Sequence, residues 1–333
     1  MKSSYNVAAL IERYFTDRLM RQRNVSSNTV ASYRDTFRLL FTFAQGRLRK
    51  PPSALVLEDL DAPFSNAFLG GLEKKRGVSI RTCNLRLTAI RSFFRFVSFE
   101  EPTRSALIQR VLAIPSKRHD KRQVNFLTRS EIEAILAAPD RTTWLGRRDH
   151  TLLLLAAQAG LRLSELIGLD RDAVHLGAGA HVRCVGKGRK ERCTPLTTHA
   201  RGALQAWLRE STRREAKALF PNVHGGRLSS DSVQALLVKY VRVASERYPS
   251  LASKRVSPHV LRHSAAMELL QAGVDCSVIA LWLGHESIET TQTYLHAHLA
   301  LKEAALAKLK PYNHSKRTRF QPNDRLLAFL EAL

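Results

Sequence analysis

The sequence has no long hydrophobic run. The apolar stretch at residues 152–157 is far shorter than the roughly 18 residues that a membrane-spanning helix needs. Near the start of the chain, Glu12, Arg13 and Asp17 interrupt the region where a signal peptide would carry its apolar segment. We therefore expect a cytoplasmic protein without a membrane segment.

Cysteine pairs and phosphate-binding loops are also missing. The four cysteines (Cys83, Cys184, Cys193 and Cys276) form no C-x-x-C pair, and in a reducing compartment they are most simply free thiols. No G-x-x-x-x-G-K-[ST] motif occurs, so nothing indicates ATP binding. His259 and His263 have the spacing of two zinc ligands on a helix, but Val260 stands where a zinc protease needs glutamate. We expect neither a metal nor another cofactor.

Acidic residues are few compared with basic ones. The chain has 29 Asp and Glu against 53 Lys and Arg, a formal net charge of +24. Such an excess indicates a polyanionic partner, most commonly nucleic acid, and the alternative is an anionic membrane surface. A hydrophobic content of 44% is enough for packed cores, and 333 residues suit two domains.

Residues 1–113 have the apolar periodicity of a helical domain. The pattern predicts helices over about 7–19, 27–44, 63–74 and 80–97, with a short closing helix at 104–113. Ser26 or Ser27 is the expected cap of the second helix, and Ser79 that of the fourth, after a break at Gly77. The fourth helix carries four arginines that we interpret as phosphate contacts, although a solvated basic face is the alternative: Arg81, Arg86, Arg91 and Arg95.

A basic segment without apolar periodicity, residues 114–124, is the predicted linker. Its candidate DNA contacts are Lys117, Arg118, Lys121 and Arg122. Beyond it, a capping box at residues 128–131 opens a helix, and an apolar helix covers 148–158 up to a break at Gly160. Three short strands are predicted at 173–176, 181–185 and 192–196, followed by amphipathic helices at 197–218 and 230–246.

The stretch from residue 257 to residue 294 gathers the chemically active side chains. Ser257 and Pro258 start a helix that carries His259 and Arg262. A second helix, at about 275–283, ends at a glycine just before His285, and a third begins near residue 287 and carries Tyr294. Arginine binds phosphate bidentately, histidine transfers protons near neutral pH, and tyrosine can act as a covalent nucleophile. The set indicates attack on a phosphodiester.

These motifs resemble the tyrosine recombinase (phage integrase) family, and its Xer-like members in particular. The matching pieces are H-x-L-R-H at 259–263, L-G-H at 283–285 and a tyrosine nine residues after that histidine. A-G-L-R-L-S-E-L at 159–166 resembles the first arginine box of the family, and V-G-K-G-R-K-E-R at 185–192 resembles its β-hairpin lysine segment. The resemblance covers 125–310 closely and the N-terminal third by pattern.

The resemblance implies a mainly α fold with a small β-sheet: an N-terminal helical core-binding domain and a mixed α/β catalytic domain that close around DNA as a C-shaped clamp. The implied catalytic residues are Arg162, Lys187, His259, Arg262, His285 and the nucleophile Tyr294, with Glu165 in support. Lys190 is the rival of Lys187, and Arg189 and Lys190 are further candidate DNA contacts.

The implied activity is site-specific recombination through a 3′-phosphotyrosyl intermediate, independent of metal and ATP. The implied partner is double-stranded DNA with inverted-repeat half-sites, bound by a homotetramer that could include a related recombinase. The catalytic domain is expected over 125–310, and a short helix in the tail at 311–333 is expected to dock on a neighbouring protomer, with docking in cis as the alternative. A type IB topoisomerase and a catalytically silent DNA-binding accessory protein remain alternatives.

Overall fold

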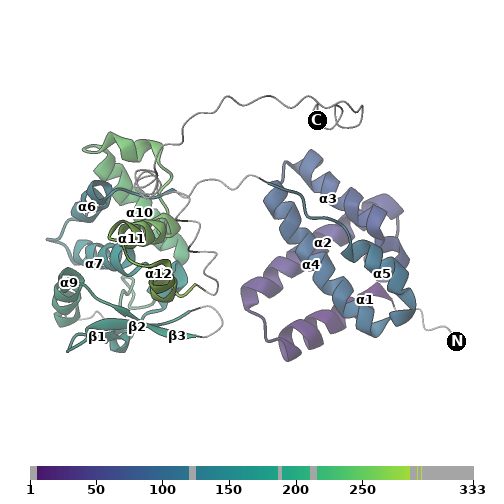
Figure 1. Cartoon of the computed structure of the whole chain (residues 1–333), viewed down its shortest axis with the longest axis horizontal. Helices are drawn as coiled ribbons and strands as arrows, with labels where there is room; N and C mark the ends of the chain where they lie inside the picture. Colours follow the sequence, from purple (N-terminus) through teal and green to yellow (C-terminus); the bar gives the residue numbers. More distant parts are fainter. Residues whose placement is uncertain are drawn as a thin grey trace, which may run out of the picture. The chain divides into compact units, whose positions relative to one another are not determined.

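The chain forms two compact units, residues 1–121 and 122–333. The computed structural model describes residues 6–119, 125–186, 190–210 and 216–285, together with Thr291 and Tyr294. In Figure 1 the first unit is coloured purple to blue and the second teal to green. The division falls within the segment 114–124, and the predicted tail at 311–333 lies outside the described residues.

The described part of the N-terminal unit is helical (Figure 1). Its elements are α1 (Val7–Arg13), a π-helical continuation (Tyr14–Gln22), α2 (Ser27–Leu48), α3 (Ala62–Arg76), α4 (Ile80–Glu100) and α5 (Ser105–Leu112), with 3₁₀ turns at Pro52–Ala54, Leu57–Leu60 and Pro102–Arg104. The side chains of Ser26 and Ser79 accept hydrogen bonds from the backbone of the third residue after each, as N-caps do. Gly77, at φ +60°, ends α3 in the left-handed conformation that favours glycine. The predicted helices of this unit are confirmed.

Aromatic side chains form the centre of this unit. The ring of Tyr14 meets Phe37 and Phe93 edge to face, with centroids 6.2 and 5.5 Å apart. Its hydroxyl lies 2.7 Å from the Ser92 hydroxyl, so its one polar atom is satisfied. Full burial of each such ring contributes about 2–3 kcal/mol. The inward face of α4 therefore anchors this helix in the core, while Arg81 and Arg95 on it remain exposed.

The C-terminal unit combines helices with one small sheet, as the predicted fold class requires (Figure 1). Its elements are α6 (Arg129–Ala137), α7 (Trp144–Ala159), α8 (Leu163–Gly168), β1 (Val174–His175), β2 (His181–Val185), β3 (Glu191–Pro195), α9 (Thr198–Arg209), α10 (Ser230–Ser245), α11 (Pro258–Gln271) and α12 (Cys276–Leu283), with 3₁₀ turns at Arg171–Ala173 and Pro249–Ser253. The strands are antiparallel in the order β1-β2-β3. Thr128 and Glu131 form the predicted capping box of α6.

Helix α7 is the central helix of the C-terminal unit. Its leucines from residue 152 to residue 155 are all buried, and it packs against α6, α9 and α11. Every residue from Thr151 to Ala157 is buried, as expected for a helical segment enclosed on every side. It begins at Trp144, four residues before the predicted start, because Thr143 caps it by accepting a hydrogen bond from the Gly146 backbone.

One predicted helix is wrong in its second half. The helix expected over 197–218 ends at Arg209, and residues 216–221 are not helical. Instead, the backbone nitrogen of Leu219 donates to the Leu169 carbonyl (2.9 Å), and Ala218 pairs with Asp170 in an isolated β-bridge. Leu219 and Phe220 are buried in the core. This tertiary pairing outweighs the helical preference of the alanine- and leucine-containing segment.

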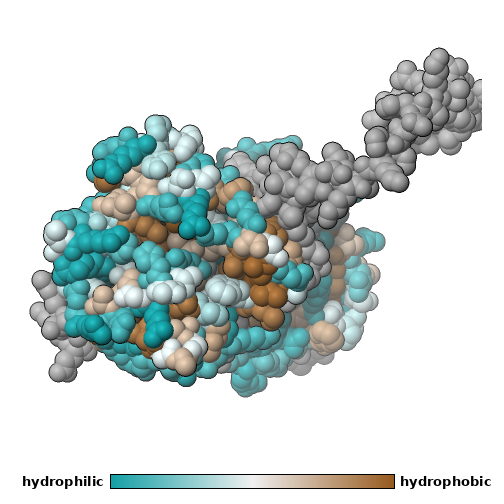
Figure 2. Space-filling view, turned by 60° about the vertical axis from the view of Figure 1, so that its left-hand side comes forward, coloured by the Kyte–Doolittle hydropathy of each residue, from teal (hydrophilic) through white to brown (hydrophobic). Residues whose placement is uncertain are grey.

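Figure 2 shows one face of the molecule, on which hydrophilic residues predominate and hydrophobic residues form separate patches. Among the described helices, none has the length and apolarity needed to cross a membrane.

Candidate active site

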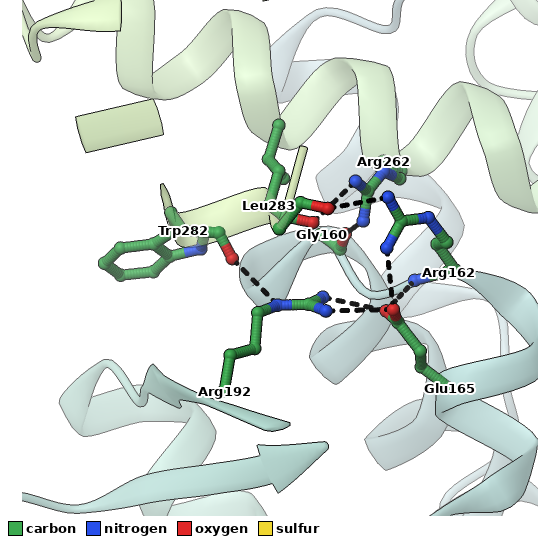
Figure 3. Close-up of polar contacts among 8 residues, drawn as sticks. Gly160, Arg162, Glu165, Arg192, Arg262, Trp282 and Leu283 are labelled. Atoms are coloured by element: carbon green, nitrogen blue, oxygen red, sulfur yellow. Dashed lines mark hydrogen bonds and ion pairs between the residues drawn. The ribbon is translucent and has the colours of Figure 1, made fainter. Parts of the chain in front are cut away.

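Three arginine side chains bind the last three backbone carbonyls at the C-terminal end of α12 (Figure 3). The pairs are Arg192 Nε to Trp282 O (3.2 Å), Arg262 Nη2 to Leu283 O (2.7 Å) and Arg162 Nη2 to Gly284 O (2.8 Å). A helix leaves its final carbonyls unpaired, and this end carries partial negative charge. The arginine side chains donate hydrogen bonds to these carbonyls, and their positive charges offset the partial negative charge. They also fix the backbone immediately before His285.

Arg262 reaches this end from α11, whose N-terminus is capped by Ser257 as predicted. Its residue is 2% exposed, and its Nη1 donates to the carbonyl of Gly160 at 2.7 Å. Burial, with the nearby positive charge of Arg162, lowers the pKa of Arg262 to about 10. The side chain therefore remains cationic at neutral pH.

Arg162 is the N-cap residue of α8, at the predicted turn. Its backbone nitrogen donates to Glu165 Oε2 and its Nη1 donates to Glu165 Oε1, each at 2.8 Å. Glu165, expected in support of the catalytic residues, thus binds both the backbone and the side chain of Arg162. The Arg162 side chain is 28% exposed, so it faces solvent in part while its orientation is fixed.

Glu165 also binds Arg192, which the sequence reasoning missed. Arg192 Nη1 and Nη2 donate to Glu165 Oε1 and Oε2 at 2.9 and 2.8 Å (Figure 3). Burial alone would favour the neutral acid, but the hydrogen bonds from Arg192 and from the Arg162 backbone lower the pKa of Glu165 to about 2. Arg192 lies opposite the buried Cys184 in the β2–β3 register, and this inward register was the signal that could have identified it.

Tyr294 is buried, and its hydroxyl oxygen lies 2.8 Å from Nδ1 of His263. Burial raises the pKa of the Tyr294 phenol, against the lowering effect of the cation of Arg262. Burial and the neighbouring His259 lower the pKa of His263 to about 4, so its imidazole is neutral at pH 7. The predicted catalytic residue His259 packs its ring edge-on against His263, with centroids 4.2 Å apart. The sequence reasoning gave His263 no catalytic role, although His263 is the last residue of the H-x-L-R-H motif.

His285 lies just beyond Gly284, where α12 ends at φ +63°. Its ring stacks on that of Tyr294, with centroids 6.3 Å apart and planes 19° apart. Its Nδ1 lies 2.7 Å from the Thr291 hydroxyl. Burial, together with the cation of Arg262, lowers the pKa of His285 to about 4. The structure thus brings Arg162, His259, Arg262, His285 and Tyr294 into one cluster.

Of the three candidate residues between β2 and β3, the structure describes only Lys190. Lys187 and Arg189 lie outside the described residues. Lys190 is exposed, and its carbonyl accepts a hydrogen bond from the Gly186 backbone at 2.8 Å.

The predicted DNA contacts of α4 and the linker have different surroundings. Arg81, Arg95 and Arg118 are exposed, and Lys117 pairs with Glu73. Arg86 donates to the Thr36 hydroxyl at 2.9 Å. Arg91 donates to the Ser116 hydroxyl and the Ile114 carbonyl. Arg86 and Arg91 therefore stabilise the fold of the N-terminal unit, whereas Lys121 and Arg122 lie outside the described residues.

No metal centre is present among the described residues, where no group of three or more His, Cys, Asp and Glu side chains is arranged to hold an ion. The Nδ1 atom of His263 is engaged by Tyr294. The four cysteines are free thiols.

Comparison with known proteins matches both units. A model described as Phage integrase family matches residues 125–300, and one described as Phage integrase, N-terminal SAM-like domain matches residues 11–101. A protein of Sinorhizobium fredii named as an integrase/recombinase, y4rC, is 59% identical over 333 residues, covering 100% of both chains. Tyrosine recombinase XerC of Pelotomaculum thermopropionicum is 35% identical over 83% of this chain and 89% of its own.

Among solved structures, the XerH site-specific recombinase bound to palindromic difH in a post-cleavage complex has a similar fold. The TM-score is 0.67 at 22% identity, over 86% of this chain and 82% of that chain. At this identity the likeness concerns the fold.

Proposed function

The chain belongs to the phage integrase family, and from that premise we propose that it is a site-specific DNA recombinase that breaks and rejoins DNA through Tyr294. The observation that carries the proposal is the pairing of the guanidinium groups of Arg162 and Arg262 on consecutive carbonyls at the end of α12, in the same cluster as a buried tyrosine. Two fixed cations beside a phenol suit a phosphodiester as substrate.

In the proposed reaction, Tyr294 Oη attacks the scissile phosphorus and the bond from phosphorus to the 5′ oxygen breaks. The products are a 3′-phosphotyrosyl bond and a free 5′-hydroxyl. The phosphotyrosyl ester keeps the energy of the broken bond, so rejoining to a new 5′-hydroxyl requires neither ATP nor a metal. The reverse attack regenerates the phenol.

Arg162 and Arg262 bind the non-bridging oxygens as negative charge develops on them. Both are held by backbone carbonyls before DNA arrives, so little reorganisation is needed in the transition state. Loss of one such donor typically costs about 3 kcal/mol of transition-state stabilisation.

The histidines divide the remaining roles. His263, neutral and 2.8 Å from the Tyr294 hydroxyl, is placed to receive the phenol proton, and His259 supports it through its ring contact. The Thr291 hydroxyl donates to His285 Nδ1 in this proposal, which leaves the other ring nitrogen to donate to the phosphate. Lys187, which lies between β2 and β3 in the sequence, protonates the departing 5′ oxygen, with Lys190 as its rival.

The proposed assembly is a homotetramer on two DNA duplexes, because recombination cuts two duplexes at two positions each. Two protomers on each duplex would recognise inverted-repeat half-sites. The helical unit and the catalytic unit would clamp the duplex, with Arg81 and Arg95 as exposed phosphate contacts. The tail at 311–333 would dock on a neighbouring protomer, a related recombinase could share the complex, and the protein would work in the cytoplasm at the nucleoid.

A trapping assay with nicked duplexes tests the chemistry. Fragments from the protein's own genetic neighbourhood are incubated with the wild type and with Tyr294→Phe, then separated on denaturing gels. A covalent band in the wild type, its loss in the variant and a free 5′-hydroxyl are expected. Tight binding of both proteins without any covalent band would support the silent accessory protein instead.

Adding a second duplex to the assay distinguishes recombinase activity from that of a type IB topoisomerase. Joining of strands between two duplexes that carry the same site is expected. Relaxation of supercoiled plasmids of any sequence by a monomer, without strand exchange, would favour the topoisomerase.

A further inference from the structure

We propose that Arg192 is a positioning residue of this active site, which holds Arg162 and the backbone before His285 in their working places through Glu165 and the end of α12. The inference rests on the proposed function. Arg192 lies on β3, Glu165 on α8 and Trp282 on α12. One side chain therefore joins three elements, through partners that are 27 and 90 residues from Arg192 in the sequence.

The contact between Arg192 and Glu165 is bidentate and buried. Both oxygens of Glu165 are within 2.9 Å of the terminal nitrogens of Arg192. The side chains are 13% and 2% exposed, respectively. A planar guanidinium matches a carboxylate in this geometry, whereas an ammonium makes only one contact of this kind at a time. The pair therefore fixes the orientation of Glu165, whose two oxygens also orient Arg162.

Arg192 also binds the end of α12, so it links the orientation of Glu165 to the position of this helix end. The Nε of Arg192 donates to Trp282 O, in the same row of carbonyls that Arg262 and Arg162 bind at residues 283 and 284. Removing Arg192 would release one of the three attachments of this helix end, immediately before His285.

Gly186 and Gly284 leave space for the Arg192 side chain because neither has a Cβ atom. A Cβ atom at Gly284 would lie 2.8 Å from Arg192 Nη1 and 3.1 Å from its Cδ and Cζ. A Cβ atom at Gly186, at the end of β2, would lie 3.1 Å from Arg192 Nη1 and 3.2 Å from Glu165 Oε1. The backbone on two sides of the guanidinium is thus shaped to hold it.

A purely stabilising role accounts poorly for this arrangement. Burying an ion pair costs desolvation that its attraction barely offsets, so apolar residues of similar size often stabilise a fold equally well. What the pair adds is orientation, because it contacts Arg162 on one side and the backbone at the end of α12 on the other. A misplacement of about 1 Å at a reacting centre can lower a rate by about 100-fold.

The test compares Arg192→Met and Arg192→Lys with a matched control, Arg147→Met. Arg147 also binds a glutamate through two nitrogens, Glu210 at 2.6 and 3.2 Å, and it donates to two backbone carbonyls, at residues 141 and 142. It joins α7 to the end of α9 and does not contact the clustered site residues through these bonds. The control therefore removes the same type of contact between arginine and glutamate from the junction of α7 and α9, without removing a hydrogen bond described above for the clustered site residues.

Three quantities are measured on full-length protein: affinity for the site DNA, single-turnover rate of covalent-complex formation, and the dependence of that rate on pH. For both Arg192 variants we expect wild-type affinity within about 3-fold and a rate lower by about 10- to 100-fold. Lysine keeps the positive charge but cannot bind both oxygens of Glu165 in the bidentate geometry, so Arg192→Lys should recover little of the lost cleavage rate. Arg147→Met should keep the wild-type rate.

The pH profile gives a readout that general destabilisation does not change. Without Arg192, Glu165 keeps its burial and loses its strongest hydrogen-bonding partner, so its pKa rises from about 2. The rate of Arg192→Met relative to the wild type should then fall as the pH is lowered from 8 to 5. The same ratio for Arg147→Met should stay constant.

The outcomes separate this inference from the proposed function. A wild type that forms no covalent complex on its own site would overturn both. A wild type that reacts while both Arg192 variants match Arg147→Met in rate and pH profile would overturn the role of Arg192 alone. If Arg192→Met fails to fold, Arg192→Lys decides: a folded protein with the wild-type rate contradicts the proposal.

Discussion

Nδ1 of His263 lies 2.8 Å from the hydroxyl oxygen of Tyr294. The residue directly after the buried Arg262 thus contacts the proposed nucleophile. A neutral imidazole at hydrogen-bonding distance from a phenol can accept its proton during attack. We therefore propose that His263, and not the predicted catalytic residue His259, receives the phenol proton.

Replacement of His263 tests that assignment. His263→Leu should lower the rate of covalent-complex formation by about 100-fold or more, because the phenol proton loses its acceptor. His263→Asn presents an amide near the position of Nδ1, so it can orient Tyr294 without taking the proton, and it should remain nearly as slow. Quenched single-turnover cleavage of nicked DNA measures both. A wild-type rate in His263→Leu, with a large loss in His259→Leu, would return the role to His259.

The stability of the C-terminal unit should depend on pH through Glu165. Its pKa is about 2 in the fold against an ordinary value of 4.5, so the stabilisation is complete above about pH 5 and is lost as the pH falls toward 2. The full effect is at most about 3 kcal/mol in the free energy of unfolding. The difference in stability between the wild type and Glu165→Gln should shrink over that range.

Urea unfolding followed by tryptophan fluorescence measures this difference. All three tryptophans, Trp144, Trp207 and Trp282, lie in the C-terminal unit, so the signal reports on that unit within the full chain. A difference that stays constant from pH 7 to pH 3 would contradict the shifted pKa of Glu165.

Gly284→Ala should slow cleavage, and Gly273→Ala should not. Both glycines have positive φ, +63° and +81°, so alanine strains the backbone at either position by about 1 kcal/mol. A Cβ atom at Gly284 would in addition press on Arg192, whereas in the described part of the chain one at Gly273 would meet open space beyond its own neighbouring residues. We expect a loss of at least about 10-fold in cleavage rate for Gly284→Ala. Equal rates in the two variants would argue against a tight fit around Arg192.

The choice between Lys187 and Lys190 as the general acid can be made with a modified leaving group. Lys187→Ala should lower cleavage by about 100- to 10,000-fold on ordinary DNA. A 5′-bridging phosphorothiolate releases a thiolate, which needs no protonation, and should restore the rate. Lys190→Ala should react like the wild type on both substrates. If the restoring effect appears with Lys190→Ala instead, the two roles are exchanged.

Local features were predictable from the sequence because neighbouring residues determine them. The caps at Ser26, Ser79 and Ser257 and the helix end at Gly284 occur where the pattern placed them. Each depends on hydrogen bonds or backbone angles within a few residues. The spacing of the family motifs likewise identified Arg162, Arg262, His285 and Tyr294, which the fold brings together in one cluster.

Long-range contacts decided the rest. The segment 216–221 pairs with residues 169–171 instead of continuing α9, and a helical pattern carries no information about that partner. Whether His259 or His263 meets Tyr294 depends on where Tyr294 lies against α11. Arg192 looked like one of many basic residues in a hairpin, since its partners Glu165 and Trp282 are 27 and 90 residues away.

The sequence by itself determined most of the helical and strand segments, the basic character of the chain and the set of residues suited to phosphodiester chemistry, because composition, periodicity and motif spacing are properties of the chain alone. Only the tertiary structure decided which of those residues touch and what holds them. Hydrogen bonds such as that of Arg162 to Gly284, 122 residues apart, form only when packing of the whole unit brings the two ends together.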